Sequence, residues 1–203
     1  MFRRPLLAAA LLCLAAFAGH AAAQTTDVSG VKFNHSVALA GSALQLNGAG
    51  TRYKTIIKVY AAALYLPAKA NTAEAVLASA GPKRMQVVML RDIDANELGK
   101  LFTRGMEDNS TREEFGKTIA GTLRLADMFA ARKKLLTGEQ FTVDYLPGRG
   151  TVITINGQPQ GEPIKEPEFF NALMRIWLGR SPADSLLKNA LLGQSAERAP
   201  HES

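Results

Sequence analysis

The chain has 203 residues, of which 47% are hydrophobic, with a formal net charge of +6 and a single cysteine. This length and apolar content suit one domain with a real hydrophobic core, and they exclude a disordered or fibrous chain. One cysteine excludes a disulfide framework and a zinc site built from several thiolates.

The first 23 residues have the pattern of a secretory signal peptide. Arg3 and Arg4 precede an uncharged run from Leu6 to Ala18, and small residues then lead up to Ala23. The run is too short to span a bilayer comfortably, although an uncleaved anchor is the alternative. We expect cleavage near Ala23 and export to the periplasm or the medium, which leaves 180 residues, a charge of +4 and no cysteine.

The rest of the chain is expected to form one domain, residues 24–193, followed by a flexible tail, residues 194–203. The polar residues 24–29 are expected to form a loose terminus. No second hydrophobic stretch approaches 18 residues, so we expect no stable membrane insertion of the mature chain.

The first half of the domain has the pattern of β structure. Residues 37–46 alternate and predict a strand, and Asn47-Gly48-Ala49-Gly50 predicts a turn. Residues 53–66 predict one long strand that is apolar on both faces and therefore covered on both. Residues 84–90 predict a further short strand.

The second half alternates between helices and a hairpin. Apolar spacing predicts a helix over 95–106, and Thr111 with Glu114 forms a capping box for the next helix. Residues 141–145 and 151–156 predict a hairpin around Pro147 to Gly150. Two helices should follow, over 167–178 and from the cap at 181–184 to Gly193. This order predicts an α+β open-faced sandwich, a mostly antiparallel sheet covered on one face by helices.

The usual catalytic signatures are missing after the leader. His35 and His201 lack the spacing of a metal pair, and His35 suits a turn. Arg132-Lys133-Lys134 is interpreted as a solvated helix terminus and not as a nucleic-acid patch. Asp94 and Glu97 suit helix capping better than acid–base work. We therefore expect no metal, no cofactor and no nucleic-acid partner.

One strand carries the candidate site. Arg52, Lys54, Lys58, Tyr53 and Tyr60 stand in or beside an otherwise apolar run. An arginine fork and a tyrosine hydroxyl could fix the head of an amphipathic ligand in an apolar cleft. In the alternative interpretation the cations lie at the solvent edge and Tyr60 belongs to the core.

The segments Gly48 to Leu66 and Arg175 to Pro182 resemble the chalcone isomerase family, in particular its exported bacterial members. The resemblance covers roughly residues 28–193 and implies the α+β open-faced sandwich of that family. It aligns Arg52 with the catalytic arginine of the plant enzymes. Their other active-site positions fall near Tyr60, Leu98, Gly105 and Ile176, and the last three cannot orient a phenol by hydrogen bonds.

A second branch of the family binds fatty acids through an arginine and a tyrosine, which Arg52 and Tyr60 match in type. On an unbroken strand these residues would lie about 26 Å apart, so the sequence predicts either a bulge between them or opposite ends of one groove. The expected function is a non-catalytic protein binding a fatty acid or similar amphipathic carboxylate through Arg52 and Tyr60. The alternatives are an isomerase or intramolecular lyase acting on a chalcone-like enone, and an envelope-assembly partner without a ligand; the oligomeric state stays open.

Overall fold

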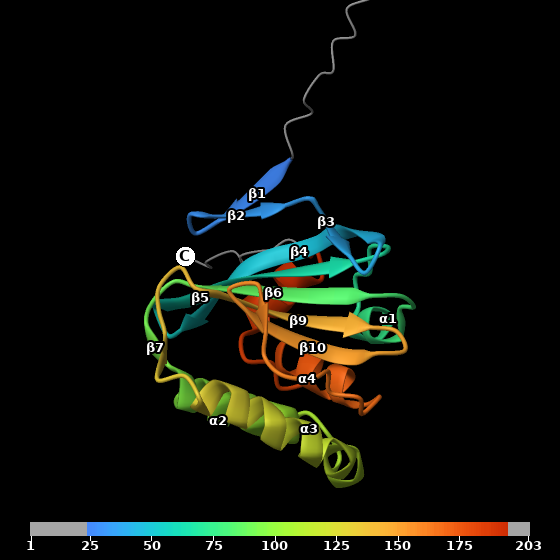
Figure 1. Ribbon diagram of the computed structural model, residues 1–203. Helices are drawn as coiled ribbons and strands as arrows, with labels where there is room; N and C mark the ends of the chain where they lie inside the picture. The colour runs from blue at the N-terminus through green and yellow to red at the C-terminus, as the bar shows by residue number, and fades with distance from the viewer. Residues whose placement is uncertain (1–23, 195–203) are drawn as a thin grey trace, which may run out of the picture.

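The protein is built around one large antiparallel sheet with helices packed on one face, as a computed structural model of residues 24–194 shows (Figure 1). Seven strands run in the order β11-β10-β9-β6-β5-β4-β3. They are β3 (Ser36–Leu39), β4 (Ser42–Lys54), β5 (Ile57–Leu66), β6 (Lys83–Met89), β9 (Gln140–Leu146), β10 (Gly150–Ile155) and β11 (Gln158–Pro159). The predicted α+β open-faced sandwich is therefore confirmed.

The helices cover the face of the sheet that holds the larger core. They are α1 (Ala73–Ala78), α2 (Ala95–Asp108), α3 (Arg112–Ala130), α4 (Phe169–Leu178) and α5 (Ser185–Leu191). Helices α2 and α3 lie side by side as a pair, and α4 contacts both (Figure 1). Phe102 of α2, Phe129 of α3 and Phe141 of β9 meet edge to face with ring centroids 5.5 to 5.8 Å apart, which joins this pair to the sheet.

The opposite face carries a smaller core under a short hairpin of β1 (Thr25–Val28) and β2 (Val31–Asn34). Phe33 of this hairpin is buried beside Leu44 and Tyr65. The expectation of a loose terminus over residues 24–29 is therefore wrong. A Ser29-Gly30 turn, in which Asp27 accepts a hydrogen bond from the Gly30 amide at 2.9 Å, folds this polar segment back onto the sheet.

Two expected strands are each divided by a tight turn. The predicted strand over residues 37–46 turns at Ala40 and Gly41, which adopt φ of +49° and +79°, and so becomes β3 and the start of β4. The predicted strand over residues 53–66 turns at Thr55, with φ of +59°, so that residues 57–66 form β5 and pair with residues 45–54 of β4. Gly41 is a typical turn residue, although the alternating pattern around it predicts a continuous strand. Thr55 is not a typical left-handed residue, so the residue types do not indicate the second turn.

The predicted turn at residues 47–50 is also wrong, because the whole segment lies inside β4. Asn47 forms a β-bulge there, and its buried side chain bonds the carbonyl oxygens of Ala70 and Leu191 at 2.9 and 2.7 Å. Gly48 faces α5 so closely that a Cβ atom would overlap the carbonyl oxygen of Ala190. The glycines are therefore small residues for helix packing and not turn residues.

The other predicted elements are confirmed with shifts of a residue or two at their ends. Thr111 and Glu114 form both hydrogen bonds of the capping box at the start of α3. Asp94 caps α2, as expected, and Asp184 caps α5. A minor pair, β7 (Ile93–Asp94) and β8 (Lys134–Leu135), closes the ends of the α2–α3 segment. The expected signal peptide and residues 195–203 lie outside the described residues.

Candidate functional site

Arg52 and Tyr60 are neighbours across the β4–β5 hairpin. Their Cα atoms are paired in the sheet register, and the Arg52 guanidinium lies 5.6 Å from the centre of the Tyr60 ring. The expectation that they lie far apart on one strand, or at opposite ends of a groove, is wrong because the chain reverses at Thr55. A bulge does intervene, at Val59, but the reversal is what brings the two side chains together.

Arg52 brings a positive charge to the site without a carboxylate beside it. Its Nε atom is buried and has no hydrogen-bond partner, and no ion pair forms between Arg52 and any other residue of the described chain. The nearby Asp184 carboxylate forms no ion pair with Arg52 and instead accepts from the amides of Tyr53, Leu186 and Leu187. An unpaired arginine that cannot lose its proton is an anion-binding group.

Tyr60 presents a neutral phenol to the same space. Its side chain is 1% exposed, and burial raises its pKa to about 12. The Trp177 indole N–H donates to the Tyr60 hydroxyl oxygen over 2.8 Å, and Trp177 packs edge to face on Phe102 at 5.6 Å. Because that oxygen accepts from Trp177, the Tyr60 hydroxyl proton is free to donate to a bound oxygen.

A cavity of about 190 Å³ lies between the hairpin and helices α2 and α4. The five positions that the resemblance aligned with a family active site all line it: Arg52, Tyr60, Leu98, Gly105 and Ile176. The rest of its wall is Leu101, Phe102, Arg104, Asp108, Ser181, Pro182 and Ala183. Arg104 and Asp108 are exposed and lie 3.7 Å apart in an i,i+4 ion pair, so they belong to the rim. The floor is therefore cationic and phenolic, and the walls are mostly apolar.

Close packing of the backbone shapes this cavity. A Cβ atom on Gly105 would lie 3.2 Å from Cγ1 of Ile176, so glycine lets α2 and α4 approach at the cavity wall. Asn109 holds the rim loop after α4, because its side chain accepts from the Ser181 amide at 2.8 Å and donates to the Ser181 carbonyl at 2.9 Å. Asp184 then fastens the same loop to the hairpin through the Tyr53 amide at 2.8 Å.

Several contributors to the site were not predicted from the sequence. Trp177 was assigned only to the apolar stripe of its helix, and Asp184 only to a cap. Asn109 and Arg104 carried no recognisable signal, because their roles depend on segments more than 70 residues away or on the shape of the rim. The nearest usable signal was Trp177, since a buried indole N–H requires an acceptor.

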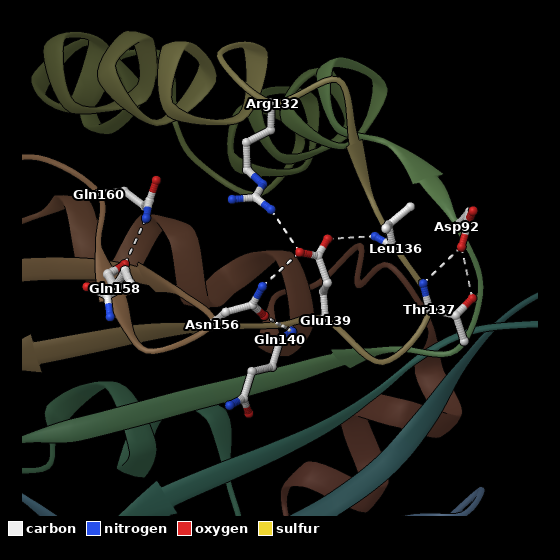
Figure 2. Close-up of polar contacts among 9 residues, drawn as sticks. All are labelled: Asp92, Arg132, Leu136, Thr137, Glu139, Gln140, Asn156, Gln158 and Gln160. Atoms are coloured by element: carbon white, nitrogen blue, oxygen red, sulfur yellow. Dashed lines mark hydrogen bonds and ion pairs between the residues drawn. The ribbon is translucent and has the colours of Figure 1, made fainter.

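Arg132 and His35, two of the polar residues considered in the sequence, have structural contacts away from this cavity. Glu139 accepts from Arg132 at 2.8 Å, from the Leu136 amide and from Asn156, while Asp92 accepts from Thr137 (Figure 2). The interpretation of Arg132-Lys133-Lys134 as a solvated helix terminus is wrong, because α3 ends at Ala130, Lys134 begins β8, and Arg132 pairs with Glu139 and fastens the next loop. His35 lies between β2 and β3 and contacts Thr26 and Gln24.

Within residues 24–194, no cluster of three histidine, cysteine or acidic side chains has the geometry to hold a metal ion. Over the same range, none of the helices combines the length and the apolar character that crossing a membrane requires.

Comparison with known proteins identifies a family and shows a likeness to solved structures. The model of the chalcone isomerase-like family matches residues 25–193. A crystal structure of a fatty-acid binding protein from Arabidopsis thaliana is similar, with a TM-score of 0.65 over 83% of this chain and 96% of the other, at 15% sequence identity. No curated protein matches the sequence. At this identity, the structural likeness bears on the fold alone.

Proposed function

The chain belongs to the chalcone isomerase-like family, and from that membership we propose that it is a non-catalytic protein that binds a fatty acid or similar amphipathic carboxylate in the Arg52 cavity. The observation that carries the proposal is the half-buried Arg52, which has no acidic partner in the described chain and faces a mostly apolar cavity. A carboxylate placed there would receive charge-assisted hydrogen bonds from Arg52 and a further one from the Tyr60 hydroxyl. The fatty-acid binding protein of similar fold adds support.

The wall of the cavity favours binding over catalysis. Cyclisation of a chalcone-like enone needs polar groups that orient the phenol and stabilise the developing charge. Here Leu98, Gly105 and Ile176 stand at the corresponding wall positions and offer no side-chain donor. A measurable chalcone turnover that is lost in Arg52→Ala would reverse this assignment and make the protein an isomerase.

The cavity accommodates the head of the ligand better than the whole of a long chain. Its volume of about 190 Å³ is below the 300–1,000 Å³ of typical ligand pockets. The half-exposed Leu101 stands at the rim, so an alkyl chain would leave the cavity past this residue or displace it. We expect affinity to rise by roughly fourfold for each methylene that is buried, and then to level off.

Trp177 offers a direct measurement, because it is the only tryptophan of the chain and its N–H bonds to Tyr60 at the site. We expect decanoate to hexadecanoate, each below its micelle concentration, to change the Trp177 fluorescence on binding. Arg52→Met should weaken binding at least tenfold, and Tyr60→Phe should weaken it less. Arg91→Met removes the same charge from an exposed position and is the matched control.

Purification of the protein from cells that express the full chain tests both the predicted export and the identity of the natural ligand. The full chain is expressed, intact mass is measured, and lipid is extracted for mass spectrometry. Export predicts loss of residues 1–23 and recovery from the periplasm or the medium. Absence of any co-purified acid, together with no fluorescence response to any added acid, would exclude the binding function.

A further inference from the structure

The tip of the β4–β5 hairpin, residues 53–58, exposes an unusual number of apolar side chains. Ile56 is 87% exposed, Ile57 is 47% exposed and Tyr53 is 37% exposed. The left-handed turn at Thr55 places Ile56 at the apex. The register pairs Tyr53 with Lys58 and Lys54 with Ile57, so each face of the hairpin tip carries one apolar and one cationic side chain. Three apolar residues in five positions form a local patch, unlike the isolated exposed leucines found on most surfaces.

Two lysines flank this patch without counterions. Lys54 and Lys58 are exposed, and neither forms an ion pair with any residue between 24 and 194. Asp184, which accepts from the Tyr53 amide at the base of the tip, forms no ion pair with either lysine. The tip therefore combines protruding apolar groups with an unneutralised positive charge.

The hairpin tip lies at the same end of the molecule as the cavity mouth. The Tyr53 amide bonds to Asp184, which directly follows the cavity residues Pro182 and Ala183. The same carboxylate caps α5, whose first turn exposes Leu186 at 59%. Leu101, 48% exposed, stands on the rim itself. A surface that bound the tip would thus meet the mouth of the cavity.

We infer that the hairpin tip docks the protein on a lipid bilayer that contains anionic lipids. Ile56 and Ile57 would enter the interface between headgroups and acyl chains, and Lys54 and Lys58 would contact anionic headgroups. Three side chains on a narrow turn cannot supply the roughly 800 Å² per partner that a stable protein interface requires, whereas a bilayer accepts a narrow apolar wedge. The docking itself is independent of the proposed function; only the transfer of an acid between bilayer and cavity rests on it.

The test uses flotation with vesicles of phosphatidylcholine alone and of phosphatidylcholine with 30% phosphatidylglycerol. The protein is used as purified from the cell, with the same N-terminus verified for every variant. We expect binding to the anionic vesicles that weakens with salt, and little binding to the neutral ones. Ile56→Ser with Ile57→Ser should weaken it at least tenfold, and Lys54→Gln with Lys58→Gln by a similar factor, at about fivefold per lysine.

Ile119→Ser with Leu123→Ser is the matched control, because these α3 residues are 48% and 61% exposed but lie away from the tip. The inference is overturned if the wild type does not bind anionic vesicles, or if the control variant loses as much vesicle binding as the Ile56→Ser, Ile57→Ser variant. It is also overturned if the tip residues instead cause the protein to dimerise in the absence of lipid. Trp177 titrations in solution should be unchanged in the tip variants. Loss of acid binding with intact flotation would reject only the proposed function, and the reverse result would reject only the docking.

Discussion

Two cationic residues, Lys83 and Arg52, are at least partly buried and have no carboxylate partner in the described chain. The chemistry of their side chains distinguishes their roles. Lys83 is 3% exposed; its ammonium donates to the Leu77 carbonyl at 3.0 Å and lies about 5.5 Å from the rings of Tyr145 and Phe170. Burial lowers the pKa of Lys83, so this group can shed its charge. Arg52 cannot, because a guanidinium stays protonated in proteins. Arg52 therefore keeps its charge throughout the pH range in which Lys83 can lose its own, which suits the proposed carboxylate ligand.

Lys83 should give the protein a characteristic alkaline response. With its folded pKa below the unfolded value of 10.5, the unfolded chain binds more protons in the pH range just below 10.5. The free energy of unfolding contributed by Lys83 therefore rises with pH through that range, and its penalty is fully present at neutral pH. Urea titrations between pH 7 and 10 should show the wild type gaining stability relative to Lys83→Met.

Burial raises the pKa of Tyr60 and of Tyr65 in the wild type and in Lys83→Met alike, so their contribution cancels when the free energies of unfolding of the two proteins are subtracted. Lys32→Met, at an exposed position of β2, is the control and should run parallel to the wild type. Parallel curves for Lys83→Met as well would show that the Lys83 ammonium is adequately solvated.

Among the elements, the contact between β4 and α5 lies beside the cavity, because the loop that leads into α5 supplies Ser181, Pro182 and Ala183 to the cavity wall. Gly50, the second glycine in this part of β4, leaves only 2.7 Å between a hypothetical Cβ atom and the Ala190 side chain. Glycine at Gly48 and Gly50 allows α5 to lie directly on the strand, and Asn47 fastens the helix end through Leu191. The cap of α5, Asp184, then reaches the hairpin beside Arg52.

A pair of glycine substitutions with opposite expected signs tests this contact. Gly48→Ala should lower the free energy of unfolding by about 1–3 kcal/mol, because its methyl group overlaps the backbone of α5. Gly116→Ala, in the second turn of α3, meets nothing within 4 Å and should raise the free energy of unfolding by up to about 1 kcal/mol through helix propensity. Chemical denaturation measures both. A Gly48→Ala protein as stable as the wild type would mean that α5 shifts freely on the strand.

For the whole molecule, ligand binding and stability should be coupled. A ligand that binds only the folded chain at a hundred times its Kd stabilises it by about 2.7 kcal/mol. For a domain of this size we expect a rise in Tm of about 5–10 °C. At the same acid concentration Arg52→Met should show a clearly smaller rise, while Arg91→Met should match the wild type, as differential scanning fluorimetry can measure. Equal shifts in Arg52→Met and the wild type would place the ligand elsewhere.

Local chemistry was enough to predict much of this protein. The capping box at Thr111 and Glu114, the apolar stripes of α2 and α4 and the two-sided burial of β5 depend on residues close in the chain, so spacing alone determined them. The α+β class followed from the order of those elements. The residue types that line the cavity were also identified, through Arg52 and Tyr60 and the aligned wall positions.

Only the tertiary structure decided how those residues meet. The turn at Thr55 contains no glycine, so the local sequence does not indicate it. This chain reversal pairs Arg52 directly with Tyr60, whereas an unbroken strand would separate them by about 26 Å. The glycines at 48 and 50, by contrast, suggested a turn but serve the approach of a helix about 140 residues later. Turn propensity and helix packing both favour glycine, and only the position of the distant helix distinguishes them.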